Sequence, residues 1–196
     1  MANTPPTLRL PRRNRYLLMR HGHSEANAAG RIISRPERGL SGFGLSPRGH
    51  AQLKALLADW PWPPPDRLVH SDFRRTTETA GWIARHFGLP LSADVGLRER
   101  NFGELEGLSD CHYPDVWTLD VDDPEHQVFG VESVTSVADR MLAVIAALEA
   151  EAHSETILLV SHGDPLQILL TAVEERPLST HRNREPLLPA GIVPLP

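Results

Sequence analysis

The sequence predicts a three-layer α/β/α sandwich with a largely parallel central sheet. Short apolar runs alternate along the chain with segments in which apolar residues recur at helical spacing. Two of these runs, residues 16–19 and 157–160, each lead into a His-Gly pair, His21-Gly22 and His162-Gly163. Because the carboxyl ends of parallel strands meet at one edge of such a sheet, we expect both histidines to face a single crevice.

Helical periodicity accounts for much of the chain between these runs. Ser46-Pro47 has the form of an N-cap followed by proline in the first turn, and Gly88 ends a second apolar stripe. The helices predicted in this way cover residues 47–60, 80–87, 134–148 and 166–173. Further strands are predicted at residues 67–71 and 156–160, with a weak edge strand at 191–193. This alternation predicts helices on both faces of the sheet.

Length and composition predict one domain. The 196 residues, of which 40% are hydrophobic, are enough for one substantial core and too few for two. Residues 1–14 are expected to form a flexible N-terminal tail and residues 15–196 the domain. Residues 108–130 show no clean period of either kind and include an acidic run at 120–125, so we expect an irregular insertion that acts as a lid.

Charge and composition exclude several classes of protein. The net charge of −5, with no basic run beyond residues 12–15, gives no sign of nucleic-acid binding. Cys111 is the single cysteine, which rules out an internal disulfide. No apolar stretch has the form of a signal peptide or a membrane span, so we expect a cytoplasmic protein without a membrane partner. The sequence leaves open whether the chain forms a homodimer.

The predicted crevice is suited to an anion. Ser24-Glu25 and Asp164-Pro165 follow the two His-Gly pairs as helix starts, which would present backbone N–H groups and a positive dipole end. Arg20 adds a permanent positive charge with a planar donor fork suited to phosphate or carboxylate. The residues themselves therefore indicate an anion-binding site with imidazole chemistry.

Residues 18–27 (LMRHGHSEAN) resemble the Arg-His-Gly signature of the histidine phosphatase superfamily. The resemblance continues through further blocks in the order of the family. These are residues 44–49 (GLSPRG), 71–80 (SDFRRTTETA), 97–107 (LRERNFGELEG), 130–133 (GVES) and 160–163 (VSHG). Together they cover roughly residues 15–172, and the resemblance implies a phosphomonoesterase.

The resemblance implies a covalent mechanism. His21 would attack phosphorus and form a phosphohistidine, while Glu99 would protonate the leaving oxygen and then deprotonate the attacking water. A nucleophilic imidazole needs a free lone pair, so His21 should be neutral, with its other ring nitrogen donating to a backbone carbonyl.

The resemblance also implies a cage of donors around the phosphoryl oxygens. Arg20, Arg75 and His162 would surround these oxygens, and Asn27 would donate to the same phosphate. His162 is expected to be partly cationic beside a dianion. Because the arginines and histidines supply the positive charge, no metal and no other cofactor is expected, and the partner is a small phosphorylated substrate.

Each assignment has an alternative. Glu99 lies between Arg98 and Arg100, where it could form surface ion pairs, and Asn27 could serve only as a helix cap. His21 and His23 form a His-x-His pattern that could bind a metal ion. A tryptophan of the lid is expected to pack rather than to contact a ligand.

Two other functions remain possible on this sequence. A phosphoglycerate mutase-type phosphotransferase would hold its substrate with basic residues, which the lid lacks. Gln167 stands at a position that is frequently basic in the family, and Asp164 at one where phosphatases often have glycine and mutases asparagine, so fewer cations are expected near the substrate than in a typical mutase. A catalytically silent phosphate-binding protein would have lost one of the key residues, and none is lost. We therefore favour a metal-independent phosphatase acting on a small metabolite.

Overall fold

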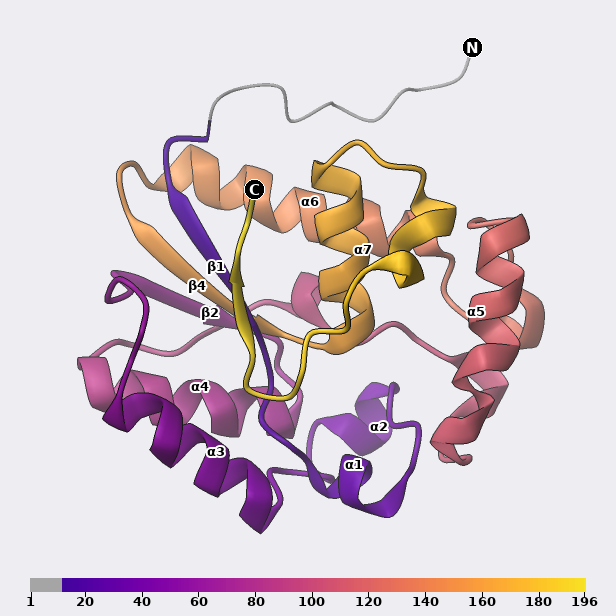
Figure 1. Ribbon diagram of the computed structural model, residues 1–196, viewed down its shortest axis with the longest axis horizontal. Helices are drawn as coiled ribbons and strands as arrows, with labels where there is room; N and C mark the ends of the chain where they lie inside the picture. Colours follow the sequence, from indigo (N-terminus) through magenta and orange to yellow (C-terminus); the bar gives the residue numbers. More distant parts are fainter. Residues whose placement is uncertain (1–11) are drawn as a thin grey trace.

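The computed structural model describes residues 12–196, which form a five-stranded sheet in the order β3-β2-β4-β1-β5 (Figure 1). The strands are β1 (Arg15–Arg20), β2 (Arg67–His70), β3 (Ser92–Ala93), β4 (Thr156–Ser161) and β5 (Ile192–Pro194). All neighbouring pairs are parallel except β1 with the edge strand β5. The predicted largely parallel sheet is confirmed.

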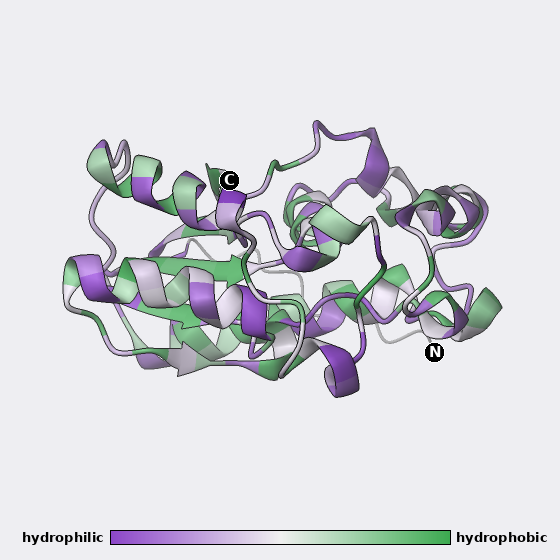
Figure 2. Cartoon of the chain, turned by 90° about the horizontal axis from the view of Figure 1, so that it is seen from below, coloured by the Kyte–Doolittle hydropathy of each residue, from purple (hydrophilic) through white to green (hydrophobic). Residues whose placement is uncertain are grey.

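Helices cover both faces of this sheet. The helices α3 (Pro47–Ala58) and α4 (Arg74–Phe87) lie on one face, and α6 (Val134–Glu151) and α7 (Gly163–Val173) lie on the other. Side chains alternate across β1, so that Leu17 packs with the first pair of helices and Leu18 with the second. Figure 2 shows the apolar strands enclosed between helices whose outer sides are largely hydrophilic. The three-layer sandwich is therefore confirmed.

The register of β1 against β4 brings the two His-Gly pairs together. Arg20 lies opposite Ser161 in this parallel pair, so His21 and His162 follow adjacent strands at the same level. After His21 the chain passes very close to α3. A Cβ atom on Gly49 would lie only 2.1 Å from the carbonyl oxygen of His23. Glycine at this position therefore allows α3 to pack against the segment that follows the first His-Gly pair.

Two short helices follow the first His-Gly pair, where the sequence predicted only a helix start. They are α1 (Glu25–Ala29) and α2 (Pro36–Gly39). Ser24 and Asn27 form a capping box at the start of α1, and Ser46 caps α3 as predicted. A serine also caps α6, the helix predicted at residues 134–148: the Ser133 side chain accepts from the backbone N–H of Ser136.

The segment 108–130 is not irregular, contrary to the prediction. It contains the ten-residue helix α5 (Tyr113–Asp122), between short 3₁₀ turns at Asp110–His112 and Val128–Gly130. The two fully buried positions of α5 are Val116 and Asp120, four residues apart. Because one of these inward positions carries a carboxylate, the apolar period that would have revealed the helix is broken.

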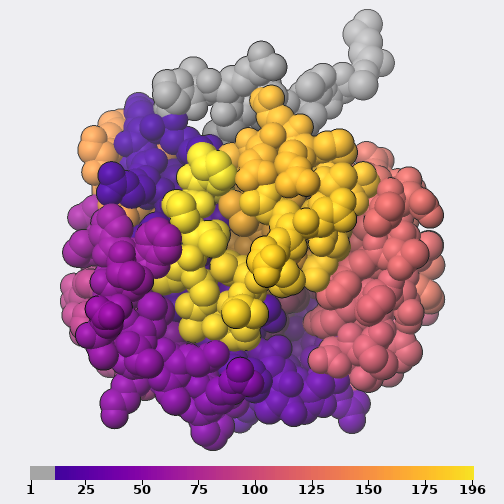
Figure 3. All heavy atoms as spheres, viewed as in Figure 1, coloured from indigo at the N-terminus to yellow at the C-terminus, as the bar shows by residue number. Residues whose placement is uncertain are grey.

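The boundary at the N-terminal end also differs from the one expected. Most of the expected tail, residues 1–14, lies outside the described residues, but Arg13 and Asn14 both donate to the Glu149 side chain. The folded part of the chain therefore begins before β1. At the other end, the C-terminal segment, residues 174–196, contacts α5 through its 3₁₀ turn at Leu178–Asn183, and Figure 3 shows this golden-orange part beside α5, in salmon. No helix within residues 12–196 is both long and apolar enough to cross a membrane.

Candidate active site

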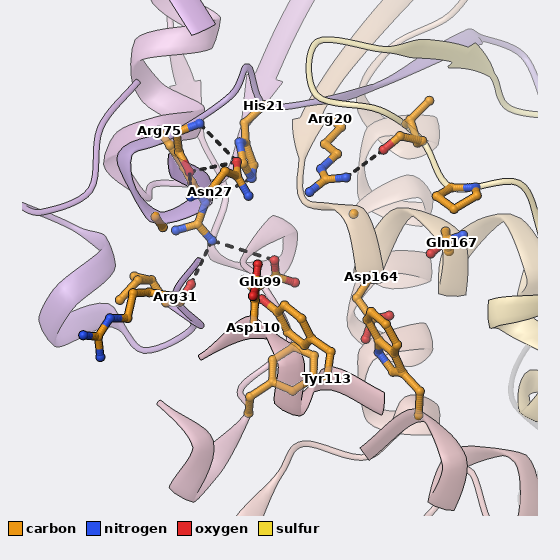
Figure 4. Close-up of a pocket in the computed structure, with 18 of the residues that line it drawn as sticks. Arg20, His21, Asn27, Arg31, Arg75, Glu99, Asp110, Tyr113, Asp164 and Gln167 are labelled. Carbon is orange, nitrogen blue, oxygen red and sulfur yellow. Dashed lines mark hydrogen bonds and ion pairs between the residues drawn. The ribbon is translucent and has the colours of Figure 1, made fainter. Parts of the chain in front are cut away.

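A pocket opens at the carboxyl end of the sheet, between the strand ends, α5 and the C-terminal segment (Figure 4). Five of the six residues predicted for the site line it: Arg20, His21, Asn27, Arg75 and Glu99. The sixth, His162, does not line the pocket but lies directly behind Arg75. The fold therefore brings together residues that are up to 142 positions apart, as the two strand ends predicted.

His21 has the geometry of a neutral imidazole. Its Nδ1 lies 2.8 Å from the carbonyl oxygen of Gly22, to which it donates, and Arg75 Nε donates to its Nε2 at 3.1 Å. An arginine can only donate, so Nε2 must carry the lone pair and Nδ1 the proton. Burial lowers the pKa of His21 well below its usual value, and the charges of Arg75 and Arg20 lower it further. The backbone carbonyl predicted to fix this tautomer is present.

His162 also has the geometry of a neutral imidazole; the partial positive charge predicted for it applies beside a bound phosphate. Arg75 Nη2 donates to its Nδ1 at 2.9 Å, so the proton lies on Nε2, which donates to the Ser71 hydroxyl at 2.9 Å. Burial lowers the pKa of His162 well below its usual value, and the Arg75 charge adds to the effect. His162 is fully buried, and the nearest carboxylate, Glu99, whose Oε2 lies 3.8 Å from Nδ1, does not offset the loss of solvation of the charged form.

Two arginines that line the pocket carry buried donors without a hydrogen-bond partner. Arg75 uses Nη2 on the Ile33 carbonyl oxygen at 3.0 Å, and Arg20 uses Nη1 on the Leu187 carbonyl oxygen at 2.9 Å. Arg75 Nη1 and Arg20 Nε are buried and have no hydrogen-bond partner. A buried donor left unpaired costs about 1–3 kcal/mol, and more when it is charged. An anion in the pocket would remove this cost.

Glu99 faces the pocket rather than forming surface ion pairs. Both of its charged neighbours are engaged elsewhere, Arg98 with Asp72 and Arg100 with Asp120, at 2.6 and 2.7 Å. Glu99 Oε2 lies 3.8 Å from Arg75 Nη2, too long for a hydrogen bond. Burial raises the pKa of Glu99 to about 7, although the Arg75 charge opposes the shift. At neutral pH this carboxyl group is therefore partly protonated and can donate a proton.

Asn27 caps α1 and also lines the pocket. Its Oδ1 accepts from the backbone N–H and the hydroxyl of Ser24, at 3.1 and 3.0 Å, and so caps α1. Its Nδ2 has no hydrogen-bond partner, and the side chain lines the pocket. Capping by the oxygen leaves the amide N–H groups free to donate to a ligand.

His23 turns away from the site. Its Nδ1 lies 2.8 Å from the hydroxyl of Ser46, the residue that caps α3, and it does not line the pocket. His21 and His23 thus do not share a ligand position. Within residues 12–196, no group of three or more His, Cys, Asp or Glu side chains is arranged to hold a metal ion.

Sequence reasoning missed a further group of residues that line the pocket. They come from α5, from the C-terminal segment and from the loops beside α1, and they include Arg31, Asp110, Tyr113, Trp117 and Arg182. Trp117, which was expected to pack, therefore also lines the pocket. Arg182 adds a cation that the sequence did not indicate, and its guanidinium donates to the side chains of Asp164 and Gln167. In the sequence, only the aromatic residues of the segment 108–130 could have indicated that these residues line the pocket.

Asp120, the first residue of the acidic run, does not face the substrate. Its two carboxylate oxygens accept from the fully buried Arg100 at 2.7 and 2.8 Å. Arg100 also donates to the carbonyl oxygen of Glu132 at 2.7 Å. This buried pair fastens α5 to the segment that carries Glu99.

The fold and the site together define an α/β protein that presents a neutral imidazole and unsatisfied guanidinium donors to an anion. The family model of the histidine phosphatase superfamily (branch 1) matches residues 16–194. The chain therefore belongs to the histidine phosphatase superfamily, and the resemblance found in the sequence is confirmed.

The most similar proteins include phosphatases and a mutase-like relative. A Mycolicibacterium vanbaalenii protein named glucosyl-3-phosphoglycerate phosphatase is 30% identical over 170 residues, covering 81% of this chain and 73% of the relative. A Klebsiella pneumoniae protein named as a probable phosphoglycerate mutase is 32% identical over 171 residues, covering 84% and 77%. The structure of a mycobacterial glucosyl-3-phosphoglycerate phosphatase with inorganic phosphate matches with a TM-score of 0.76 and 25% identity, covering 94% of this chain and 89% of that one. Within its family, the protein is an enzyme of the phosphatase type.

Proposed function

We propose that this protein is a metal-independent phosphomonoesterase that hydrolyses a small phosphorylated metabolite through a phosphohistidine on His21. The observation that carries the proposal is the lone pair on His21 Nε2, which is held beside the Arg75 guanidinium at 3.1 Å. A phosphoryl group bound by that guanidinium would bring its phosphorus to this nitrogen. Positioning and charge stabilisation are the main demands of phosphoryl transfer.

In the first step, His21 Nε2 attacks phosphorus and the P–O bond to the alcohol breaks. The proton on Glu99 passes to the leaving oxygen, so that the alcohol departs neutral and Glu99 becomes a carboxylate. The raised pKa of Glu99, about 7, supports this role because the group still holds a proton near neutral pH.

In the second step, the Glu99 carboxylate takes a proton from a water molecule as the water oxygen attacks phosphorus. The P–N bond breaks, inorganic phosphate leaves and His21 recovers its lone pair. Glu99 is then protonated again, so the cycle leaves every group as it began. One carboxyl group serves both steps because the alcohol and the water occupy the same side of phosphorus.

The charge for both steps comes from the chain itself. Arg75 and Arg20 line the pocket with donors that have no partner, Arg75 Nη1 and Arg20 Nε, which would bind the phosphoryl oxygens, and Asn27 Nδ2 would add a neutral donor. Preorganised donors in a buried site stabilise developing negative charge strongly. These groups support catalysis without a metal ion. The proposal includes a cytoplasmic location and no nucleic-acid or membrane partner.

A phosphoglycerate mutase-type activity is the second candidate, and the Klebsiella relative is the observation that favours it. A mutase returns the phosphoryl group to a second hydroxyl of a bound acid, whereas a phosphatase transfers it to water. Phosphate release from a panel of phosphorylated metabolites, measured with chelator present, tests the proposal. We expect release of stoichiometric phosphate without any added metal. Isomerisation of phosphoglycerate without phosphate release would instead establish the mutase, and activity only after addition of a metal would contradict metal independence.

A further inference from the structure

One arginine holds the backbone of the segment that carries Glu99. Arg140 lies on α6, and its Nη1 donates to the carbonyl oxygens of Gly96 and Arg98 at 2.7 and 2.8 Å. Its Nη2 donates to the carbonyl oxygen of Glu99 itself at 3.3 Å. A guanidinium presents its N–H groups in a rigid planar fork, so bonds to three carbonyl groups within four residues fix both the position and the orientation of this backbone.

Glu132 fixes the Arg140 guanidinium in turn. Its two carboxylate oxygens accept from Arg140 Nε and Nη2, at 2.8 and 3.0 Å, in a bidentate pair. Its Oε2 also accepts from the backbone N–H of Asn101 at 3.2 Å. All five N–H groups of Arg140 are thereby used, on three carbonyl groups and one carboxylate. Glu132 belongs to the block at residues 130–133, which the proposed mechanism leaves without a role.

The same segment packs closely against α6 and β4. A Cβ atom on Gly96 would lie 2.5 Å from a methyl carbon of Val144, one turn after Arg140 on α6. The hydroxyl of Ser161, the last residue of β4, donates to the carbonyl oxygen of Leu97 at 2.7 Å. Four consecutive carbonyl groups, at residues 96–99, therefore accept from side chains. Because residues 98–100 belong to no helix or strand, their position depends on these side chains.

The side chain of Glu99 has few contacts that could orient it. Its Oε1 accepts from the backbone N–H of Arg100 at 3.0 Å, and its Oε2 lies 3.8 Å from Arg75 Nη2, beyond hydrogen-bond distance. The direction of the carboxyl group is thus set by the backbone of its own segment. Neither Arg140 nor Glu132 lines the pocket, so neither contacts a ligand there.

We propose that Arg140, fixed by Glu132, is a positioning residue that directs the Glu99 carboxyl group toward the leaving oxygen. The inference rests on the proposed phosphatase function and gives the block at residues 130–133 a part in it. A general acid must lie within hydrogen-bond reach of the atom that it protonates, and a misplacement of about 1 Å can cost about 10²-fold in rate. Loss of the Arg140 guanidinium should therefore impair proton donation and leave the phosphoryl donors Arg20 and Arg75 in place.

The test compares an alkyl and an aryl leaving group in R140M, which keeps a long side chain and removes every donor. We expect kcat for glycerol 3-phosphate to fall about 10- to 100-fold. The kcat for p-nitrophenyl phosphate should stay within about threefold, because its leaving oxygen hardly needs the proton. KM should change little for either substrate, since Arg140 does not line the pocket. D139N is the matched control, because Asp139 is the exposed neighbour of Arg140 on α6.

A double variant separates positioning of Glu99 from general support of the fold. In a Glu99→Gln background no proton remains to be directed, so adding R140M should change kcat for glycerol 3-phosphate by less than about twofold. A further loss as large as that in the wild-type background, or an equal loss on both substrates in R140M alone, would overturn the proposal. If R140M does not fold, R140K takes its place. A single ammonium cannot serve three carbonyl groups and a carboxylate at once, so the same selective loss is expected, and unchanged kinetics in R140K would overturn the proposal.

Titration of Glu99 distinguishes failure of this inference from failure of the phosphatase function. Burial raises the pKa of Glu99 to about 7, so a segment released by R140M should admit water and lower the pKa toward its usual value. Carbon-13 NMR of labelled glutamate carboxyl groups, with the Glu99 signal assigned from Glu99→Gln, measures this pKa without turnover. A wild-type protein that hydrolyses neither substrate contradicts the proposed function. Where glycerol 3-phosphate is not turned over, the titration decides: a lowered pKa in R140M supports the positioning role, and an equal pKa in both proteins overturns it.

Discussion

Arg75 Nε lies 3.1 Å from His21 Nε2, the nitrogen that would attack phosphorus. In the free protein this hydrogen bond occupies the lone pair and shields it from protons, and burial adds to the effect by lowering the pKa of His21. A substrate replaces that contact, because its phosphoryl oxygens can accept from the same guanidinium. In the proposed mechanism, the His21 imidazole is therefore already neutral and positioned before substrate binds.

A phosphoryl group should become trapped on His21. Brief reaction with a ³²P-labelled substrate followed by alkaline quenching should yield an acid-labile phosphoprotein, because phosphoramidates survive alkali and hydrolyse in acid. Peptide mapping should place the label at residue 21, and His21→Ala should remove both the label and turnover. His23→Gln is the matched control, since His23 lies two residues away but turns toward Ser46. A label on His162 or on a serine would overturn the assignment.

Glu99 and Arg75 should be distinguishable by the leaving group. A general acid contributes about 10²–10⁴-fold, and this contribution matters most when the leaving alcohol is a poor one. Glu99→Gln should therefore lower kcat strongly on an alkyl phosphate and leave kcat on an activated aryl phosphate, such as p-nitrophenyl phosphate, largely unchanged. Arg75→Ala should slow both substrates alike, by about 10²–10³-fold, because it removes a charge that stabilises the phosphoryl group itself. An equal loss on both substrates in Glu99→Gln would remove Glu99 from the role of acid.

The activity should fall at alkaline pH. Glu99 must be protonated in the first step, and its pKa is raised to about 7, so kcat/KM for an alkyl phosphate should decline as the pH rises through about 7. His21 must be neutral, and since its pKa is lowered, the acidic limb should lie well below the usual value for histidine. Rate profiles between pH 5 and 9 with an alkyl and an aryl phosphate measure both limbs. The alkaline limb should be weak for the aryl phosphate and absent in Glu99→Gln; an alkaline limb that persists in this variant would belong to another group.

The buried pair of Arg100 and Asp120 should control stability rather than chemistry directly. Arg100→Leu leaves Asp120 buried without its main partner, which should lower the free energy of unfolding by about 3–5 kcal/mol. Urea denaturation followed by circular dichroism measures this loss. The double variant, Arg100→Leu with Asp120→Leu, removes both charges and should recover much of the lost stability. A double variant that is as unstable as the sum of the single variants would show that the two charges do not act as a pair.

The sequence alone determined the features that depend on residues close to one another along the chain. Alternating apolar runs and helical stripes defined the sandwich, and the positions of His21 and His162 after two such runs placed them at one sheet edge. Ser46 and Pro47 marked the start of α3 because capping is satisfied within one helical turn. These features need no knowledge of distant partners, so a local pattern is sufficient to predict them.

Only the tertiary structure decided where the charged side chains point. Asp120 faces inward because Arg100 neutralises it, and that inward charge concealed α5 from any search for apolar periodicity. Glu99 faces the pocket because its neighbours Arg98 and Arg100 pair with carboxylates 26 and 20 residues away. Arg182 reaches the site from the C-terminal segment because Asp164 and Trp117 hold it there. Burial and pairing set the energy of a charge, and both depend on residues that the fold brings together from distant parts of the chain.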